Sequence, residues 1–368
     1  MLTLPRVTPG AALLLTLIPT LSVRAQTSEP SSVRALEVTG AITVDGWLEE
    51  EAWARAQHVS NFTQRELDFG DPVTERTEVA VLFDSGALYI GFWGFDSDPE
   101  GILANEMARD FSWGGDDNFE MVLDPFGDNR NGYLFVTNPN GAMADALIAD
   151  NGGAVNRDWD GVWEVRARVT DEGWFAEIRI PFSTLRFGPR PEEGWGINFE
   201  RNIRRKREQV LWQGWSRDFN LEQLSRAGTL TGLHDLGSVR LLDLRPHGLG
   251  GLEWEEGEDR SSVEHLGLDA LYQPSAAWRV NVTVNPDFAQ VESDREEVNL
   301  TRFSLFFPEK REFFLEGQEF FDFSLGSDSR PFYSRRIGLA PDRTEVPILG
   351  GARVLGKRGA TTLGAMVL

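Results

Sequence analysis

The side chains best suited to contact a ligand are a tryptophan and a glutamate seven residues apart. Trp113 stands in the polar loop DFSWGGDD, and Glu120 follows in the segment DNFE. A flat aromatic ring among polar residues can stack on the pyranose ring of a sugar, and a carboxylate can accept hydrogen bonds from its hydroxyl groups. Two other interpretations stay open: Trp113 can fold back onto its own sheet, and Glu120 can be a surface charge on a strand.

A second group of polar side chains occupies the turn DPFGDNRNG. Oxygen ligands at such short spacing suit calcium, which accepts six to eight oxygens at flexible angles. The possible ligands are Asp124, Asp128, Asn129 and Asn131. Because Asp and Asn are also common turn residues without any metal, calcium is only one interpretation of this turn. Weaker candidates in the next acidic loop are Asp150, Asp158 and Asp160.

Composition argues against most catalytic classes and against nucleic acid. The 368 residues include 58 Asp and Glu against 36 Lys and Arg, a net charge of −22, so a polyanion is a poor partner. There is no cysteine, and the four histidines are isolated, which nearly excludes zinc hydrolase chemistry. Nucleophile-elbow, P-loop and dinucleotide-binding motifs are absent. Asp116 and Asp117 are adjacent and would point to opposite faces of a strand, so they are a poor glycosidase pair.

The first 25 residues have the pattern of a secretory signal peptide. Arg6 supplies the charged start, Ala11–Leu21 is an apolar run, and Val23–Ala25 fits cleavage between small residues. The alternative, a membrane anchor, needs about 20 apolar residues. We therefore expect cleavage before Gln26 and export to a bacterial cell envelope, the outer membrane or the cell surface.

Alternating apolar and polar residues, interrupted by turns, predict an all-β fold from Leu36 onward. Val79–Phe83 and Leu88–Phe95 flank a turn and predict a hairpin. A second hairpin surrounds Asp171–Gly173, with one buried and one solvent-exposed face. A short helix or turn is expected at Leu48–Ala56. The positive block Arg201–Arg207 is interpreted as a solvated strand edge or as a contact for lipopolysaccharide phosphates.

Five motifs in sequence resemble the family 9 carbohydrate-binding module, a β-sandwich found attached to xylanases and other polysaccharide-degrading enzymes. They are GAITVDGWLEEEAW, VAVLFDSGALYIGFWGFD, WGGDDNFEMVLD, EGWFAEIRIPFSTL and GINFERN. The resemblance covers about residues 33–236 and implies a jelly-roll sandwich. It implies that the chain is not itself catalytic but is linked to the hydrolysis of O-glycosyl compounds.

The resemblance also implies which residues contact the sugar. The implied set is Trp113, Glu120, Glu200, Asn202, Trp212 and Trp215. Trp113 would stack on the ring, and Trp212 or Trp215 would supply the opposite side of an aromatic clamp. Glu200 stands where the family has a glutamine, and the family's arginine contact has no counterpart among Phe135–Thr137.

Residues 240–368 have a different character. Asn285–Phe321 resembles the segment that follows such a module in a large group of bacterial envelope proteins, in which the rest of the chain resembles an outer-membrane β-barrel. Trp278–Val284, Val346–Val354 and Thr361–Leu368 are short enough to be membrane strands. We therefore expect residues 240–368 to be the start of a β-rich envelope domain, in a truncated chain, and the outer membrane to be a partner.

Two functions remain in competition at this stage. The first is non-catalytic binding of a poly- or oligosaccharide at the cell surface, in support of polysaccharide breakdown. The second is an outer-membrane β-barrel protein whose sandwich is a periplasmic or surface cap for transport or assembly.

Overall fold

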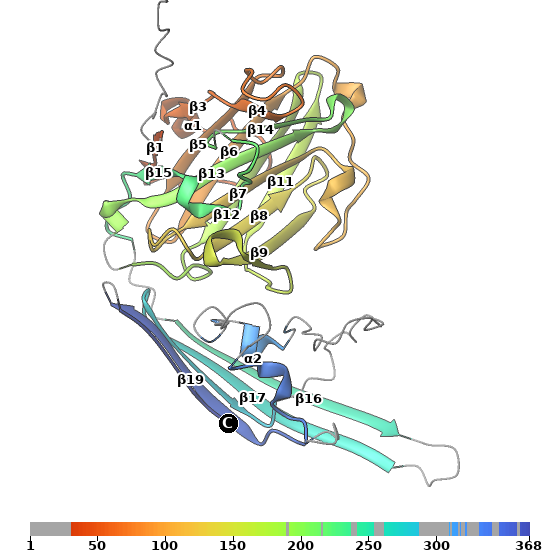
Figure 1. The fold of residues 1–368 in the computed structure, drawn as a ribbon, viewed down its shortest axis with the longest axis vertical. Helices are drawn as coiled ribbons and strands as arrows, with labels where there is room; N and C mark the ends of the chain where they lie inside the picture. The colour runs from red at the N-terminus through yellow and green to blue at the C-terminus, as the bar shows by residue number, and fades with distance from the viewer. Residues whose placement is uncertain are drawn as a thin grey trace, which may run out of the picture.

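The structure is a computed structural model of the chain, and it is nearly all β. It describes residues 31–188, 191–214, 216–236, 241–253, 261–286, 309, 311–315, 317, 321, 331–340, 346–358 and 361–368. Within these residues the strands form three sheets, named A, B and C here. Figure 1 shows sheets A and B packed as one body, with sheet C as a separate curved layer. The predicted all-β class, a sandwich followed by a further β-rich region, is confirmed.

Sheet A has nine strands and carries one outer face of the sandwich. Its strands are β1 (Ser32–Arg34), β4 (Thr63–Glu66), β7 (Asn118–Asp124), β8 (Gly132–Thr137), β9 (Met143–Ala149), β10 (Ala154–Asn156), β13 (Trp195–Ile203), β14 (Glu208–Leu211) and β15 (Gly228–Thr231). The main order is β1-β15-β13-β7-β8-β9-β10, and β14 joins β13 to β4. The central pair, β7 and β13, is antiparallel, with Glu120 opposite Glu200.

Sheet B has six strands and forms the other layer. Its strands are β2 (Leu36–Glu37), β3 (His58–Val59), β5 (Thr77–Phe83), β6 (Ala87–Phe95), β11 (Glu164–Thr170) and β12 (Gly173–Pro181). The core lies between the two layers, where Phe92 of β6 stacks on Phe119 of β7 with 4.4 Å between ring centroids. Both predicted hairpins are present, as β5–β6 and β11–β12, and the expected helix is α1 (Glu51–Arg55).

The outer face of sheet B differs from the prediction. On β12, Trp174, Ala176 and Ile178 face the core as expected, but Glu177 on the opposite face is also fully buried. The segment around α1 covers it, because the Trp53 indole and the backbone N–H of Asp45 both donate to the Glu177 carboxylate. This face is therefore only partly solvent-exposed.

Sheet C is antiparallel, in the order β16 (Leu241–Glu253), β17 (Ser261–Ser275), β18 (Trp278–Val284), β19 (Gly350–Arg358) and β20 (Thr361–Val367). One face carries apolar side chains that are 40–82% exposed: Leu242, Leu244, Leu266, Leu268, Tyr272, Val282, Val284, Leu363 and Val367. The opposite face buries polar side chains, among them Gln273, Arg279, Thr283 and Arg353. Helix α2 (Glu312–Leu315) lies over this polar face, where Arg353 donates to the carbonyl of Phe313.

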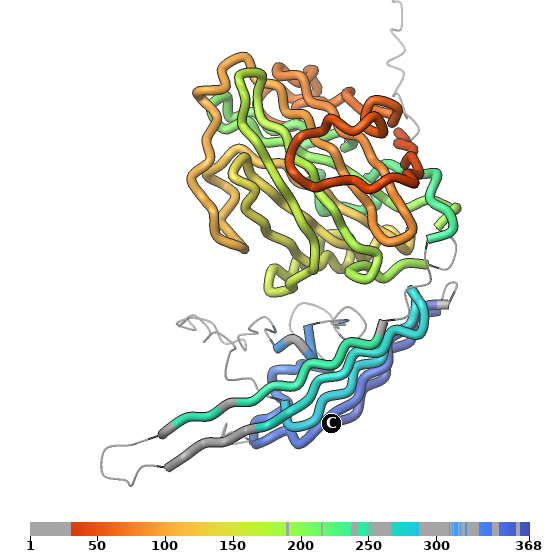
Figure 2. The backbone as a smooth tube through the Cα atoms, turned by 180° about the vertical axis from the view of Figure 1, so that it is seen from behind, coloured from red at the N-terminus to blue at the C-terminus, as the bar shows by residue number. Residues whose placement is uncertain are grey.

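The sandwich and sheet C meet through a few polar contacts, and Figure 2 shows the two bodies from behind. The Lys357 ammonium of β19 lies 2.6 Å from an Asp128 carboxylate oxygen and 4.6 Å from the ring centroid of Phe126. Arg279 of β18 donates to the carbonyl of Ser183 at 3.3 Å. In the part of the chain that the structure describes, the helices are too short or too polar to cross a membrane.

Candidate functional site

Trp113 lies in a single 3-10 turn, η2 (Trp113–Gly115), just before β7. Its carbonyl accepts hydrogen bonds from Asn118 Nδ2 at 2.9 Å and from Arg204 Nη2 at 3.2 Å, so the backbone at the start of the turn is fixed. The indole is half-buried, and the guanidinium of Arg157 lies 4.0 Å from its ring centroid. Phe111 contacts the ring edge-on at 6.2 Å. One aromatic face is therefore already covered by a cation.

Next to this turn, two predicted residues, Glu120 and Glu200, converge with Asn118 on the side-chain amide of a third predicted residue, Asn202. Asn202 Nδ2 lies 2.8 Å from Asn118 Oδ1, 3.2 Å from Glu120 Oε1 and 2.8 Å from Glu200 Oε1. The alternation of β13 and its register with β7 place all four side chains on the outer face of sheet A. Gln209 of β14 adds a further hydrogen bond, from Nε2 to Glu200 Oε1 at 2.6 Å.

This group has more acceptors than donors. A carboxamide nitrogen carries two hydrogens, yet three oxygens surround the Asn202 nitrogen at hydrogen-bond distance. Burial raises the pKa of Glu120 well above its usual value, and the negative charge of Glu200 raises it further. Burial likewise raises the pKa of Glu200, against the hydrogen bonds from Asn202 and Gln209. The two carboxyl groups therefore favour a state in which one of them holds a proton.

The predicted aromatic clamp is only partly present. Trp212 is fully buried in the sandwich core, where it packs 5.5 Å from the ring of Phe199, so its assignment to a sugar-binding surface is wrong. The reason is strand parity: Val210 and Trp212 point into the core, whereas Gln209 and Leu211 point outward. Trp215 lies outside the described residues.

The predicted calcium turn is occupied by hydrogen-bond donors. Asp124 accepts from the backbone N–H groups of three following residues, among them Asn129 at 2.7 Å. Asp128 accepts hydrogen bonds from two backbone N–H groups and from the side-chain amide of Asn131. It also accepts one from the Lys357 ammonium, which supplies the positive charge that a metal ion would otherwise supply. These donors already engage the oxygens of Asp124 and Asp128, and in the described ranges no three His, Asp or Glu side chains are grouped to hold a metal. Calcium binding by this turn stays a prediction. Of the weaker candidates, Asp150 pairs with Arg130 and Asp160 with Arg109.

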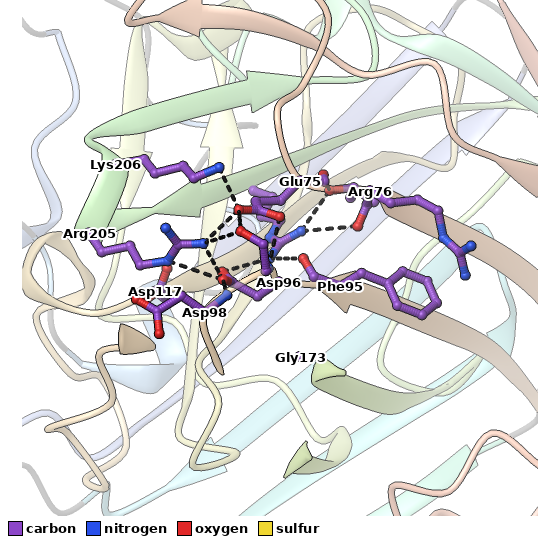
Figure 3. A network of polar contacts seen from close by, with 12 residues as sticks. Glu75, Arg76, Phe95, Asp96, Asp98, Asp117, Gly173, Arg205 and Lys206 are labelled. Carbon is purple, nitrogen blue, oxygen red and sulfur yellow. Dashed lines mark hydrogen bonds and ion pairs between the residues drawn. The ribbon is translucent and has the colours of Figure 1, made fainter. Parts of the chain in front are cut away.

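Two cations of the positive block at the end of β13, Arg205 and Lys206, are paired with carboxylates of the chain. Arg205 pairs with Glu75 at 2.6 Å and also with Asp96, and Lys206 contacts Glu75 as well (Figure 3). Burial acts to raise the pKa of Glu75, but hydrogen bonds from Lys206, Ser97 and Arg205 outweigh it and lower the pKa to about 2. Arg205 and Lys206 are therefore bound to carboxylates of the chain and are not free to bind a phosphate group, whereas Arg207 of the same block is exposed.

Sequence reasoning missed Asn118, Arg157 and Gln209, which complete the surroundings of Trp113, Glu200 and Asn202. Gln209 could have been found, because an outward residue on a strand after β13 must lie beside an outward residue of β13. Arg157 lies beyond β10, in a loop whose path no local pattern predicts.

Comparison with known proteins gives limited further information. A family described as a domain of unknown function (DUF5916) matches residues 238–354. Among curated proteins, none matches the chain. A solved structure from Bacteroides uniformis ATCC 8492, named provisionally as a carbohydrate-binding protein, is 14% identical, with 55% of this chain and 99% of that one covered and a TM-score of 0.44.

A family 9 carbohydrate-binding module from Caldicellulosiruptor kristjanssonii is similar in two solved structures. Its complex with glucose is 16% identical, with 56% of this chain and 98% of that one covered and a TM-score of 0.40. Its complex with cellotriose is 16% identical, with 57% and 99% covered and a TM-score of 0.39. With TM-scores below 0.5, these likenesses carry no functional argument, and the assignment depends on the chain's own residues.

Proposed function

We propose that the chain binds a poly- or oligosaccharide, without catalysis, on the outer face of sheet A. The binding group, called the sheet A site, consists of Trp113, Glu120, Glu200 and Asn202. The observation that carries the proposal is the convergence of Glu120, Glu200 and Asn118 on the single Asn202 amide, directly beside the Trp113 turn. A cluster with surplus acceptor oxygens suits a ligand that brings several hydroxyl donors.

The sugar would stack on the indole of Trp113 in the position that the Arg157 guanidinium now takes. Arg157 lies 4.0 Å from the ring centroid, the distance of a cation–π contact, which contributes only about 0.5–1 kcal/mol at an accessible site. A sugar can therefore displace it at low cost. The hydroxyl groups would then donate to Glu120 and Glu200, which now compete for the hydrogens of Asn202.

The proposal is tested by retention of the purified chain on insoluble polysaccharides. Trp113→Ala should abolish retention while leaving the thermal unfolding midpoint unchanged within a few degrees, because the ring is only half-buried. Arg157→Ala should strengthen retention, since the competing cation is gone. Val162→Ala, at a side chain that is 71% exposed, is the control. Unchanged retention by Trp113→Ala would refute the sheet A site.

We further propose that this binding supports polysaccharide breakdown at the surface of the cell from which the chain is exported. The support for export is the signal-like pattern of residues 1–25. Fusion of the chain to a reporter in a bacterial host tests it: the reporter should be found outside the cytoplasm, and removal of residues 1–25 should keep it inside.

A second candidate function is favoured by the apolar outer face of sheet C, whose exposed side chains include Leu244, Leu266 and Val282. An antiparallel sheet with apolar residues outside and polar residues beneath is the reverse of a soluble arrangement and is typical of a wall facing lipid. In this case the sandwich would be a cap on an outer-membrane domain for transport or assembly.

Vesicle flotation distinguishes the two. The full chain should float with phosphatidylethanolamine–phosphatidylglycerol vesicles, and Leu244→Asp with Val282→Asp should abolish flotation. The exposed sandwich substitution Val162→Ala should not. Failure of the unmodified chain to float would remove this second function and leave saccharide binding untouched.

A further inference from the structure

The opposite outer face of the sandwich, on sheet B, carries a pocket of about 660 Å³. The aromatic part of its lining is Trp47, Trp93, Phe95 and Phe175. Its volume falls within the range of about 300–1,000 Å³ typical of small-molecule sites. These four residues with Arg76 are called the sheet B pocket below. None of them belongs to the sheet A site, which lies on the other layer.

The pocket floor is built by strand register. Phe175 of β12 is the direct neighbour of Trp93 on β6, and Phe95 lies two residues further along β6 on the same face. The rings of Phe95 and Phe175 meet edge-on at 5.5 Å. The guanidinium of Arg76 lies 3.5 Å from the centroid of the Phe95 ring. Figure 3 shows these two side chains next to each other. The floor is therefore formed by the adjoining rings of Phe95 and Phe175 with Trp93 beside them on β6, and the Arg76 guanidinium lies over the Phe95 ring.

The wall carries the exposed ring of Trp47, whose side chain is 45% accessible. It follows a tight turn in which Gly46 has a φ of +85°, a conformation that favours glycine. The buried carboxyl group of Glu177 fixes this turn by accepting the backbone N–H of Asp45 at 3.1 Å. Arg168, which does not line the pocket, supports the Trp47 ring at 4.5 Å. The indole is thus presented by a built turn and is not a loose surface side chain.

The far side of the pocket is held from within the sandwich. Arg201 of β13 has no exposed surface and donates to the carbonyl of Phe95 at 2.9 Å and to that of Arg76 at 3.3 Å. Figure 3 shows the neighbouring cluster, in which Asp96 and Glu75 bind Arg205. The backbone at Arg76 and Phe95 is therefore fixed before any ligand binds, which reduces the entropy lost on binding.

We propose that the sheet B pocket is a second saccharide-binding site and that it takes neutral sugars. Aromatic faces with a few polar groups at the edge are the surface on which pyranose rings stack. Three acidic residues line the pocket, Glu49, Asp171 and Glu172, against the single basic residue Arg76. This excess of negative charge repels uronic acids and phosphorylated glycans, whereas neutral hydroxyl groups can donate to the same carboxylates. The sheet B pocket would bind its sugar without any residue of the sheet A site.

The test counts binding sites on the full chain, kept in mild detergent, by isothermal titration with the neutral trisaccharides cellotriose, xylotriose and mannotriose. For at least one of these trisaccharides, we expect the unmodified chain to bind at two sites. The variant Trp47→Ala should bind at one site only, because its affinity at the sheet B pocket should fall at least about thirtyfold. Phe175→Ala should also lose the site at the sheet B pocket. The double variant that combines Trp47→Ala and Trp113→Ala should bind none of the trisaccharides. Trigalacturonate should not bind at the pocket.

The outcomes separate the two sites. Loss of one site in Trp47→Ala but none in Trp113→Ala would support the pocket and refute the sheet A site. If Trp113→Ala loses one binding site and Trp47→Ala titrates like the unmodified chain, the sheet B pocket is overturned and the proposed function stands. Binding of trigalacturonate that Trp47→Ala removes would overturn the preference for neutral sugars. Lack of binding by all three neutral trisaccharides would overturn both sites.

Discussion

Glu177 gives the sharpest physical prediction, because an acid is enclosed beneath the turn that carries Trp47. The side chain has no exposed surface. Burial raises its pKa to about 7, and nearby Glu50 also raises it, although the backbone N–H of Asp45 and the indole N–H of Trp53 act in the opposite direction. The folded chain therefore binds a proton at pH values at which the unfolded chain has released it.

The sign and size of the effect follow from linkage. Between the ordinary pKa of 4.5 and about 7, the folded state holds more protons than the unfolded state, so the free energy of unfolding falls as the pH rises. The stabilisation is complete below pH 4.5 and lost above about pH 7. A difference of about 2.5 pKa units, at about 1.4 kcal/mol each, corresponds to about 3.4 kcal/mol as an upper limit.

The assay compares Glu177→Gln with the unmodified chain by urea unfolding, followed by tryptophan fluorescence at half-unit steps from pH 4 to 8. Other buried acids contribute equally to both proteins, so the difference between the two curves isolates Glu177. We expect the variant to gain up to about 3 kcal/mol relative to the parent as the pH rises from 4.5 to 7.5. Glu172→Gln, an exposed acid near the same pocket, should leave the pH profile unchanged. Parallel curves for Glu177→Gln and the parent would refute the reasoning.

Three further predictions concern buried charges. In a double-mutant cycle, Lys357→Met and Asp128→Asn should show a coupling of about 1.5–3 kcal/mol in urea unfolding. Burial acts to raise the pKa of Asp128 but is outweighed by hydrogen bonds from Lys357 and backbone N–H groups, so the pKa is lowered and the coupling should disappear as the pH falls below about 4. Arg201→Met should lower the free energy of unfolding by about 2–4 kcal/mol, because the buried Thr77 hydroxyl and the Phe95 carbonyl lose their donor while Asp96 keeps its ion pair with Arg205; an effect below about 1 kcal/mol would contradict this. Burial raises the pKa of Glu120 and the negative charge of Glu200 raises it further; Glu200→Gln removes only this second cause, so titration calorimetry should find saccharide affinity less dependent on pH than in the parent.

Much of the fold could be predicted because each strand obeys a local rule. The period of two in β12 placed its core face correctly, and the turn residues marked the hairpins β5–β6 and β11–β12. The same rule explains why Glu200 and Asn202 share a face. Their meeting with Glu120 required the family resemblance, since pairing between β7 and β13 joins segments about 80 residues apart.

What could not be predicted depends on contacts between distant segments. The burial of Glu177, and with it the sheet B pocket, results from the segment around Trp53 lying on the outer face of sheet B. Gly91 permits this approach, because a Cβ there would lie 2.9 Å from atoms of Leu48 and Trp53. The error over Trp212 has a different cause. Residues two positions apart in a strand share a face, so the sequence already placed Trp212 with the apolar Val210 on the core face, but the family resemblance led us to expect an aromatic clamp there.

The placement of the two sites relative to sheet C gives the arrangement a functional consequence. Strand β7 runs from Asn118 at the sheet A site to Asp124 at the turn that contacts Lys357, about 20 Å at about 3.3 Å per residue. Strand β12 likewise runs from Phe175 in the sheet B pocket toward Ser183, which contacts Arg279. Both sites therefore lie at the strand ends remote from sheet C, one on each outer face.

If sheet C faces lipid, the sandwich would hold both sites away from the membrane, where one long polysaccharide could reach them together. Binding to both would then be tighter than to either alone, so Trp47→Ala and Trp113→Ala should each weaken retention on a long polymer more than they weaken binding of a trisaccharide to the site that remains.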